Sequence, residues 1–168
     1  MPINKKIRRK LLIMAQADQA MRTGKSLWNK AKDRERAHHL AEIVMCHGWP
    51  DANMVGIEGA TAAWLIAQHA DFDVKLQAHF LKLLRASVSK KKAPASHLAY
   101  LADRVRVNHG RPQLYGTQFR TNKRGKLTLW KVVNRKQLDI RRKHIGLEPI
   151  ALYRKRMLAK STTIKKRR

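Results

Sequence analysis

An almost entirely apolar segment, residues 60–70, is the feature that most restricts how this chain can fold. The segment is rich in alanine and contains Trp64, Leu65 and Ile66, so a helix formed by it is apolar on nearly every side. Such a helix must be covered by other elements and cannot lie on a surface. Apolar residues recur at helical spacing before and after it, so we expect the covering elements to be helices as well.

Turn-forming and capping residues divide the rest of the chain into elements. Gly48-Trp49-Pro50 is expected to end a helix, because proline cannot extend a helix and glycine accepts the turn conformation. Asp71 and Asp73 stand where the following helix needs an N-cap. Asn122-Lys123-Arg124-Gly125 lies between two short alternating stretches, which predicts a β-hairpin near residues 117–132. Helices are predicted over about residues 5–22, 31–47, 60–70, 74–88, 96–108, 135–143 and 149–158, with a loop over residues 51–59.

The predicted fold class is therefore mainly α with a small β-hairpin, arranged as a compact single helical domain with basic terminal extensions. A chain of 168 residues is long enough for a hydrophobic core without disulfides or metals. The predicted organisation is a basic N-terminal extension over residues 1–10, the helical domain with its hairpin over residues 11–158, and a basic C-terminal tail over residues 159–168. The tail lacks apolar periodicity, so we expect it to be disordered until it binds a partner.

The charge of the chain points to a polyanionic partner. Lys and Arg number 38 against 11 Asp and Glu, which gives a net charge of +27. Residues 1–40 hold 11 basic and 3 acidic residues, residues 41–110 hold 8 and 6, and residues 111–168 hold 19 and 2. Two basic flanks that repel themselves would be stabilised by a phosphate backbone. A general basic bias among the proteins of the source would explain scattered charge, but it accounts less well for so concentrated a block.

These considerations predict a structural RNA-binding protein, ribosome-associated or a ribonucleoprotein subunit, with structured RNA of ribosomal type and neighbouring proteins as partners. No base-reading DNA motif is present, and the predicted helix over residues 135–143 lacks the apolar face that membrane binding requires. Trp130 is expected in the core. The predicted nucleic-acid contacts are Lys5, Lys6, Arg8, Arg9, Arg120, Lys123, Arg124, Lys126, Arg135, Lys136, Arg141, Arg142, Lys143, Arg154, Lys155, Arg156, Lys165, Lys166, Arg167 and Arg168.

A polar cluster offers an alternative: an enzyme or small-ligand-binding domain that uses His69, Asp71, Asp103 and Arg104. In that hypothesis His69 or Asp103 acts as acid and base, and Arg104 or Arg111 holds an anion. The spacing of His69, Asp71 and Asp73 matches no established metal signature, and helix capping explains it better, so neither a metal nor another cofactor is expected. Against this alternative, both His69 and Asp103 are expected to hold structure, His69 as a partly buried side chain with a hydrogen-bond partner and Asp103 as a paired carboxylate.

Five sequence blocks resemble an uncharacterised bacterial domain family. The blocks are GWP at residues 48–50, WLIAQHAD at 64–71, AYLADRV at 99–105, GRPQLYGTQF at 110–119 and RRKHIGLEP at 141–149. The resemblance covers about residues 10–158 and implies a compact, mainly helical fold with a small strand element, but no activity. Members of that family are typically neutral or acidic, and they carry acidic residues where this chain has Lys131, Arg135 and Lys136.

The compartment is less well defined by the sequence. The single cysteine, Cys46, excludes an intramolecular disulfide and weakly favours a reducing intracellular compartment. No apolar run approaches the roughly 20 residues that cross a bilayer. The apolar stretch at residues 11–14 is too short for the core of a signal peptide.

Overall fold

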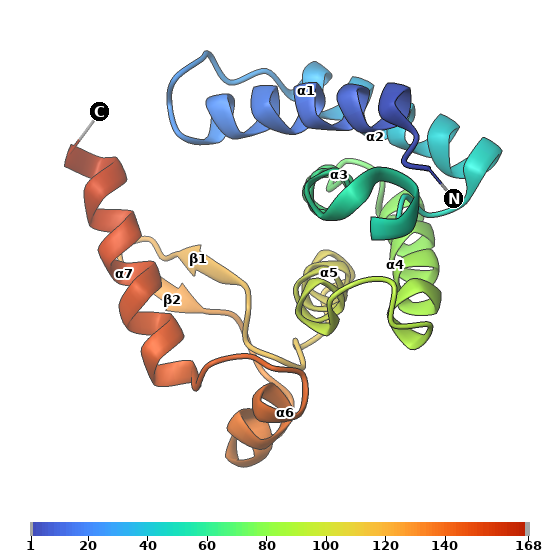
Figure 1. Cartoon of the computed structure of the whole chain (residues 1–168). Coiled ribbons are helices and arrows are strands. Elements are labelled where there is room, and N and C mark those ends of the chain that lie inside the picture. Colours follow the sequence, from blue (N-terminus) through green and yellow to red (C-terminus); the bar gives the residue numbers. More distant parts are fainter. Residues whose placement is uncertain (1, 167–168) are drawn as a thin grey trace. The chain divides into compact units, whose positions relative to one another are not determined.

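The computed structural model describes residues 2–166, with side chains described through residue 160. The described part of the chain contains seven α-helices, one short 3-10 helix and one two-stranded hairpin (Figure 1), which confirms the mainly α fold with a small hairpin. The chain divides into two compact units, Met1–Leu98 (unit 1) and Ala99–Arg168 (unit 2). No helix in the described part has both the length and the apolar character needed to cross a membrane.

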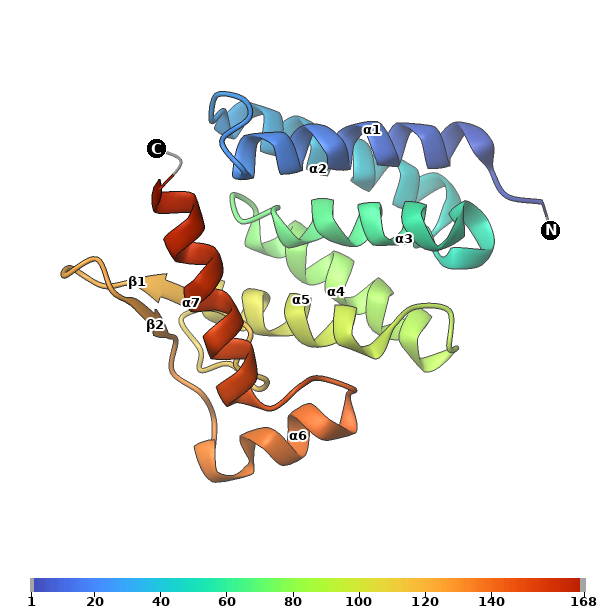
Figure 2. The ribbon, with the colours of Figure 1, turned by 60° about the vertical axis from the view of Figure 1, so that its left-hand side comes forward.

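Unit 1 is a bundle of helices built around α3 (Ala52–Gln68). Helix α1 (Lys5–Arg22) packs along α3, as Figure 2 shows, and α2 (Lys30–His47) and α4 (Val74–Ser89) contact it as well. The predicted burial of the apolar segment is therefore confirmed. Small alanine side chains on α3 let larger residues of its neighbours approach closely. The largest apolar side chains with 2% exposure or less are Leu11, Leu40, Ile66, Phe80 and Leu84.

Helix α3 begins earlier than the sequence predicts, within the segment expected to be a loop. Asp51 caps it, because its Oδ1 accepts the backbone N–H groups of Asn53 and Met54 at 3.0 Å. Gly56 then interrupts the helix with a φ of 73° and a ψ of 166°. A Cβ at Gly56 would lie 2.6 Å from Arg8 Nη1, which itself donates to the Val55 carbonyl at 3.1 Å. The predicted loop is therefore wrong: Gly56 forms a kink inside a helix, and the kink makes room for Arg8.

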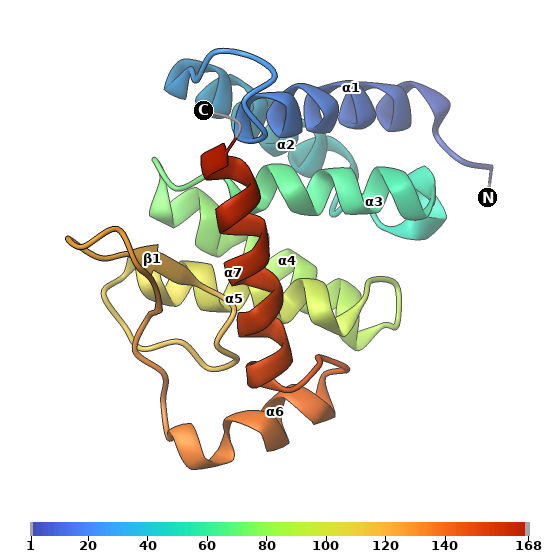
Figure 3. The same cartoon turned by 90° about the vertical axis from the view of Figure 1, so that its left-hand side faces the viewer.

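Unit 2 contains most of α5 (Ala95–Asn108), strands β1 (Phe119–Thr121) and β2 (Leu127–Leu129), the 3-10 helix η1 (Arg135–Gln137), α6 (Leu138–His144) and α7 (Ile150–Lys166). The strands are antiparallel, with Arg120 opposite Thr128. Figures 1, 2 and 3 all place the hairpin beside α7, and the rings of Phe119 and Tyr153 lie 5.7 Å apart. The apolar core of unit 2 includes Leu101, Leu138 and Tyr153, which are 0%, 1% and 4% exposed.

Helix α7 is longer than the sequence predicts. It continues to Lys166, whereas the loss of apolar periodicity predicts an end near residue 158 and a disordered segment after it. Apolar periodicity reports which face of a helix is buried, not whether the backbone is helical. No glycine or proline follows Pro149 in the sequence, so nothing there stops the helix. Arg167 and Arg168 lie outside the described residues, and so do the side chains of Lys165 and Lys166.

Candidate nucleic-acid interface

The core of unit 2 is organised by Asp103, a fully buried carboxylate on α5. Its Oδ1 accepts the backbone N–H groups of Leu114 at 2.6 Å and Tyr115 at 3.0 Å. Its Oδ2 accepts both the backbone N–H and the hydroxyl of Thr117 at 3.0 Å. Burial raises the pKa of the Asp103 carboxyl above its ordinary value, although these donors oppose the shift. Asp103 thus anchors the loop that leads into the hairpin, which confirms the expectation that it holds structure.

Two more polar side chains complete the support of this loop. The Gln113 amide is fully buried, donates to the Gln118 and Trp130 carbonyls at 3.1 and 3.0 Å, and accepts the Gln118 N–H at 2.8 Å. The Arg142 guanidinium is 1% exposed and donates to the carbonyls of Tyr115 and Glu148. Because Arg142 is buried within unit 2, it does not reach the surface on which a nucleic-acid contact was predicted.

The adjacent Arg141 has a similar role. Its Nε donates to the Leu114 carbonyl at 2.8 Å, and its Nη2 donates to the Val133 carbonyl at 2.5 Å. Lys143, the third cation of the run, is exposed. One run of three cations on α6 therefore divides into two arginines that hold backbone carbonyls and a lysine that faces outward. Planar guanidinium groups can bridge several carbonyls at once, which an ammonium group does less well.

The hairpin carries its cations on the outside. Phe119 points toward Tyr153, so its neighbour Arg120 points to the opposite face of the strand. The Arg120 guanidinium lies over the Trp130 ring, 4.5 Å from the ring centroid. Trp130 is half-buried, so the expectation that it belongs to the core is wrong. Lys123, Arg124 and Lys126 are exposed in and beside the turn. The outer face of the hairpin thus presents an arginine–tryptophan stack with further cations at its tip.

Helices α6 and α7 add further exposed cations to unit 2. Arg156 pairs with Glu148 at 2.6 Å, while Arg154 and Lys155 on the same helix are exposed. Lys131 and Lys160 are exposed as well, although neither was predicted as a contact. Nothing in the sequence around these two lysines indicated that they would be exposed. We call the exposed predicted cations other than Arg156 the unit 2 cation set. Its members are Arg120, Lys123, Arg124, Lys126, Arg135, Lys136, Lys143, Arg154 and Lys155.

Carboxylates are far too few in unit 2 to neutralise these cations. Its sequence holds 21 Lys and Arg against 3 Asp and Glu. Asp103 accepts the loop donors, Asp139 accepts the backbone N–H of Ile150 at 2.7 Å, and Glu148 pairs with Arg156. Two of the three carboxylates therefore accept hydrogen bonds from backbone N–H groups. Unit 2 keeps a large positive charge whose natural counter-charge is outside the chain.

Unit 1 balances its charge more evenly, with 17 Lys and Arg against 8 Asp and Glu. Among the predicted contacts of α1, Arg8 pairs with Glu58 and holds the Val55 carbonyl, whereas Lys5, Lys6 and Arg9 are exposed. Lys10 lies 3.8 Å from Glu42, and Lys32 lies 2.8 Å from Glu35. Three surface cations of unit 1, Arg8, Lys10 and Lys32, thus have carboxylate neighbours.

The alternative site residues have structural contacts within their own units. His69 ends α3, and its Nδ1 lies 2.9 Å from Asp18 Oδ1, which Arg22 Nε approaches to 3.1 Å. Burial raises the pKa of Asp18, but the hydrogen bond and charge of His69 and the charge of Arg22 bring it below its ordinary value. Asp71 accepts from Gln77 Nε2 at 3.1 Å, and Arg104 donates to Gln118 Oε1 at 3.3 Å.

The expected cap of α4 is confirmed, because Asp73 accepts the Leu76 N–H at 2.9 Å. No group of three or more His, Cys, Asp or Glu side chains in the described residues is arranged to hold a metal ion. The Asp18–Arg22–His69 cluster was not predicted. Asp18 and Arg22 are four residues apart on α1, but nothing in the sequence indicates that His69, at the end of α3, lies beside them. Arg22 also reaches Asp33 at 3.0 Å, so the cluster joins α1, α2 and the end of α3.

The chain belongs to a family of unknown function, DUF6624, whose sequence model matches residues 5–167. This agrees with the expectation of an uncharacterised domain family. No curated protein and no solved structure matches the chain. The membership therefore brings no activity with it, and the function must be argued from the residues.

Proposed function

We propose that the protein binds structured RNA through the unit 2 cation set, as a structural component of a ribonucleoprotein particle such as a ribosome. The observation that carries the proposal is the charge of unit 2, which has 21 Lys and Arg against 3 carboxylates. Three carboxylates are too few to neutralise the cations of unit 2. RNA phosphates would supply the missing counter-charge and release condensed ions into solution.

The chemistry of the cations suits phosphate contact. Arginine binds phosphate through paired N–H donors, and lysine adds mobile point charges that need no fixed geometry. The contact of the Arg120 guanidinium with the Trp130 ring positions an exposed cation on the hairpin where it can meet a phosphate. Trp130 is half-buried, so its ring supports the arginine more than it offers a platform to bases.

The distribution of the cations favours a folded RNA over a regular duplex. They extend over the hairpin, α6 and α7, and no single long helix carries them into a major groove. Phosphates of a folded RNA are likewise spread over a surface instead of along one groove. This arrangement fits a protein that stabilises RNA structure with little base preference. In a ribonucleoprotein particle, neighbouring proteins would be its further partners.

The proposal is tested by measuring the binding of the full chain to a structured RNA, a single-stranded RNA and a duplex DNA over a series of salt concentrations. We expect the structured RNA to bind most tightly. The logarithm of its binding constant should fall with the logarithm of the salt concentration by about 0.7 to 0.9 for each neutralised phosphate. Absence of binding at low salt, or equal affinity for duplex DNA and structured RNA, contradicts the proposal in its RNA-specific form.

A further inference from the structure

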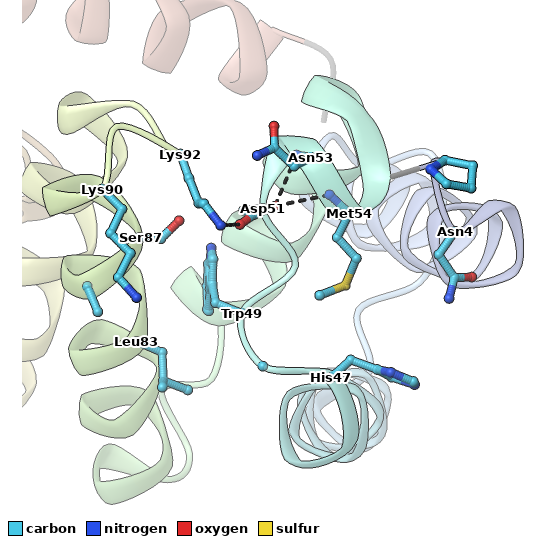
Figure 4. Close-up of a pocket in the computed structure, with 13 residues that line it drawn as sticks. Asn4, His47, Trp49, Asp51, Asn53, Met54, Leu83, Ser87, Lys90 and Lys92 are labelled. Atoms are coloured by element: carbon cyan, nitrogen blue, oxygen red, sulfur yellow. Dashed lines mark hydrogen bonds and ion pairs between the residues drawn. The ribbon is translucent and has the colours of Figure 1, made fainter.

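Unit 1 contains a cavity that the RNA proposal does not use. It has a volume of about 640 Å³, within the range of pockets that take small organic ligands. Figure 4 shows the residues that line it. They come from the N-terminal segment, from the turn between α2 and α3, from the first turn of α3 and from the end of α4. The lining consists of Pro2, Asn4, His47, Gly48, Trp49, Asp51, Asn53, Met54, Leu83, Ala86, Ser87, Lys90 and Lys92.

One side chain of the lining lacks a partner that its burial requires. Ser87 is 6% exposed, and its hydroxyl is buried without a hydrogen-bond partner. A buried, unpaired hydroxyl costs about 1–3 kcal/mol, so such groups are rare unless something binds them. Its neighbour Ser89 donates to the Ala86 carbonyl at 2.9 Å, the usual way in which a helical serine is satisfied. The Ser87 hydroxyl points instead toward the side of the cavity formed by Trp49 and Asp51 (Figure 4).

The remaining lining divides into an apolar and a cationic part. Trp49, Met54 and Leu83 provide apolar surface, and Trp49 is itself fixed by packing, with its ring 6.4 Å from that of Phe80. Lys90 and Lys92 lie on either side of Ser87 in Figure 4. Lys92 forms an ion pair with Asp51, at 3.5 Å, and Asp51 also caps α3. Of the two lysines, Lys90 is therefore the one that is more available to an anionic ligand. A ligand with a flat apolar body, a polar edge and an anionic group matches this lining.

We propose that this cavity binds a nucleotide, with the base against Trp49, Met54 and Leu83, a polar group of the base on the Ser87 hydroxyl, and the phosphate at Lys90. A base offers apolar faces and both donors and acceptors on its edge, and a hydroxyl can satisfy either. The cavity and its unpaired hydroxyl are observed independently of the proposed RNA function. The choice of a nucleotide over other aromatic anions rests on that proposed function. Two sources share this chemistry, a free mononucleotide and an unpaired nucleotide of a bound RNA.

The test is isothermal titration calorimetry of the full chain with each of AMP, GMP, CMP and UMP. At least one should bind saturably, and the matching nucleoside and inorganic phosphate should each bind more weakly. Ser87→Ala should weaken binding by about 2- to 10-fold, the effect of one hydrogen bond. Lys90→Gln should reduce the advantage of the nucleotide over its nucleoside. Ala86→Phe, which places a ring in the cavity, should abolish binding.

Matched controls exist on the same segment of the chain. Ser89→Ala removes a hydroxyl that does not line the cavity, and Lys91→Gln removes a cation that does not line it; neither should change nucleotide affinity. Thermal unfolding of each variant shows that it is folded. Absence of binding by all four nucleotides at millimolar concentration overturns the proposal. Equal binding of nucleotide and inorganic phosphate also overturns it, and so does binding that both Ser87→Ala and Lys90→Gln leave unchanged.

A second titration distinguishes the two sources and keeps this inference separate from the RNA proposal. A short single-stranded oligonucleotide that displaces the bound mononucleotide identifies the ligand as an unpaired nucleotide of a strand, and failure to displace it identifies a free nucleotide. The Ala86→Phe variant should retain salt-dependent binding to structured RNA, because the unit 2 cation set is unchanged. Nucleotide binding without RNA binding would refute the proposed function alone, and the reverse result would refute this inference alone.

Discussion

Units 1 and 2 of this chain are stabilised by different kinds of buried side chain. Unit 1 satisfies its backbone in long helices and packs them through alanine, leucine and isoleucine around α3. Unit 2 has a long irregular loop, and its buried Asp103, Gln113 and Arg142 take up the backbone groups that no helix or sheet satisfies. A long irregular loop can thus be held by a few buried polar side chains.

The two units also differ in the charge at the surface. In unit 1 the cations Lys10, Arg22 and Lys32 have carboxylate partners. In unit 2 only three carboxylates accompany 21 Lys and Arg, and two of them, Asp103 and Asp139, accept backbone N–H groups. Unit 2 is therefore strongly positive because its sequence contains few carboxylates. The following predictions test this comparison, starting with the largest expected effect.

Replacing Asp103 with alanine should destabilise the protein most. The substitution leaves the buried N–H groups of Leu114, Tyr115 and Thr117 without their acceptor, so we expect a loss of about 3–5 kcal/mol in the free energy of unfolding. Denaturant unfolding followed by circular dichroism measures it. Asp103→Asn keeps one carbonyl acceptor and should lose less. A loss below that of an average surface substitution would show that the loop is held by other means.

Replacing Asp18 with alanine should cost less, about 2–3 kcal/mol, because Arg22 keeps its contact with Asp33. The lowered pKa of Asp18 means that its contribution is present at neutral pH. This contribution should disappear as the pH falls below the ordinary value of 3.8 and through the folded-state pKa. Unfolding of the wild type and Asp18→Ala at several pH values checks both expectations. If the difference between the two proteins were the same at pH 3 as at pH 7, the ion pair would not be its cause.

His97 provides a pH test in unit 1. Its ring stacks on Trp64 with centroids 4.2 Å apart, and burial lowers its pKa from 6.5 to about 4. Between pH 6.5 and pH 4, His97 is therefore protonated in the unfolded chain but neutral in the folded chain. Stability should fall by up to about 3 kcal/mol as the pH drops from 7 to 4, at roughly 1.4 kcal/mol per pKa unit. His97→Phe retains the stacking and should remove this part of the pH dependence. An unchanged pH profile in His97→Phe would show that the imidazole remains accessible to solvent.

Deleting residues 160–168 should have the smallest effect on stability, below about 0.5 kcal/mol. The core contact of α7 is made earlier in the helix, where Tyr153 donates its hydroxyl to the Thr117 carbonyl at 3.1 Å. The deletion removes five cations, so RNA affinity should nevertheless fall. Thermal unfolding and RNA binding of the same truncated protein test the two statements together. A large drop in melting temperature would show that this segment packs against the rest of unit 2.

The elements of the fold follow largely from local sequence signals. The apolar spacing of residues 5–22 and the Asp73 cap identify α1 and α4, and the Asn122–Gly125 turn identifies the hairpin. The start of α3 could not be read in this way, because the Arg8 side chain that lies against the kink at Gly56 comes from another helix. Local signals report what one segment prefers, whereas a kink that makes room for a distant side chain depends on tertiary packing.

The candidate sites are less accessible to sequence reasoning. Arg141, Arg142 and Lys143 are consecutive cations, yet two hold loop carbonyls and one is exposed, a division set by which face of α6 meets the loop. The cavity around Ser87 likewise combines four segments that are separated in the sequence. The total charge and its distribution along the chain could be predicted from the sequence. The contacts that bury individual arginines could not be predicted, because they depend on tertiary packing.

The central claim is that the unit 2 cations contact RNA phosphates while the paired lysines of unit 1 do not. The most direct test compares the salt dependence of structured-RNA binding in two double variants, Lys123→Gln with Lys126→Gln, and Lys10→Gln with Lys32→Gln. Each removes two positive charges, so a purely global charge effect would change both equally. We predict that the hairpin variant loses up to about 1.4–1.8 from the slope of log K against log salt, while the unit 1 variant keeps the wild-type slope. Equal slopes in the two variants would contradict the claim.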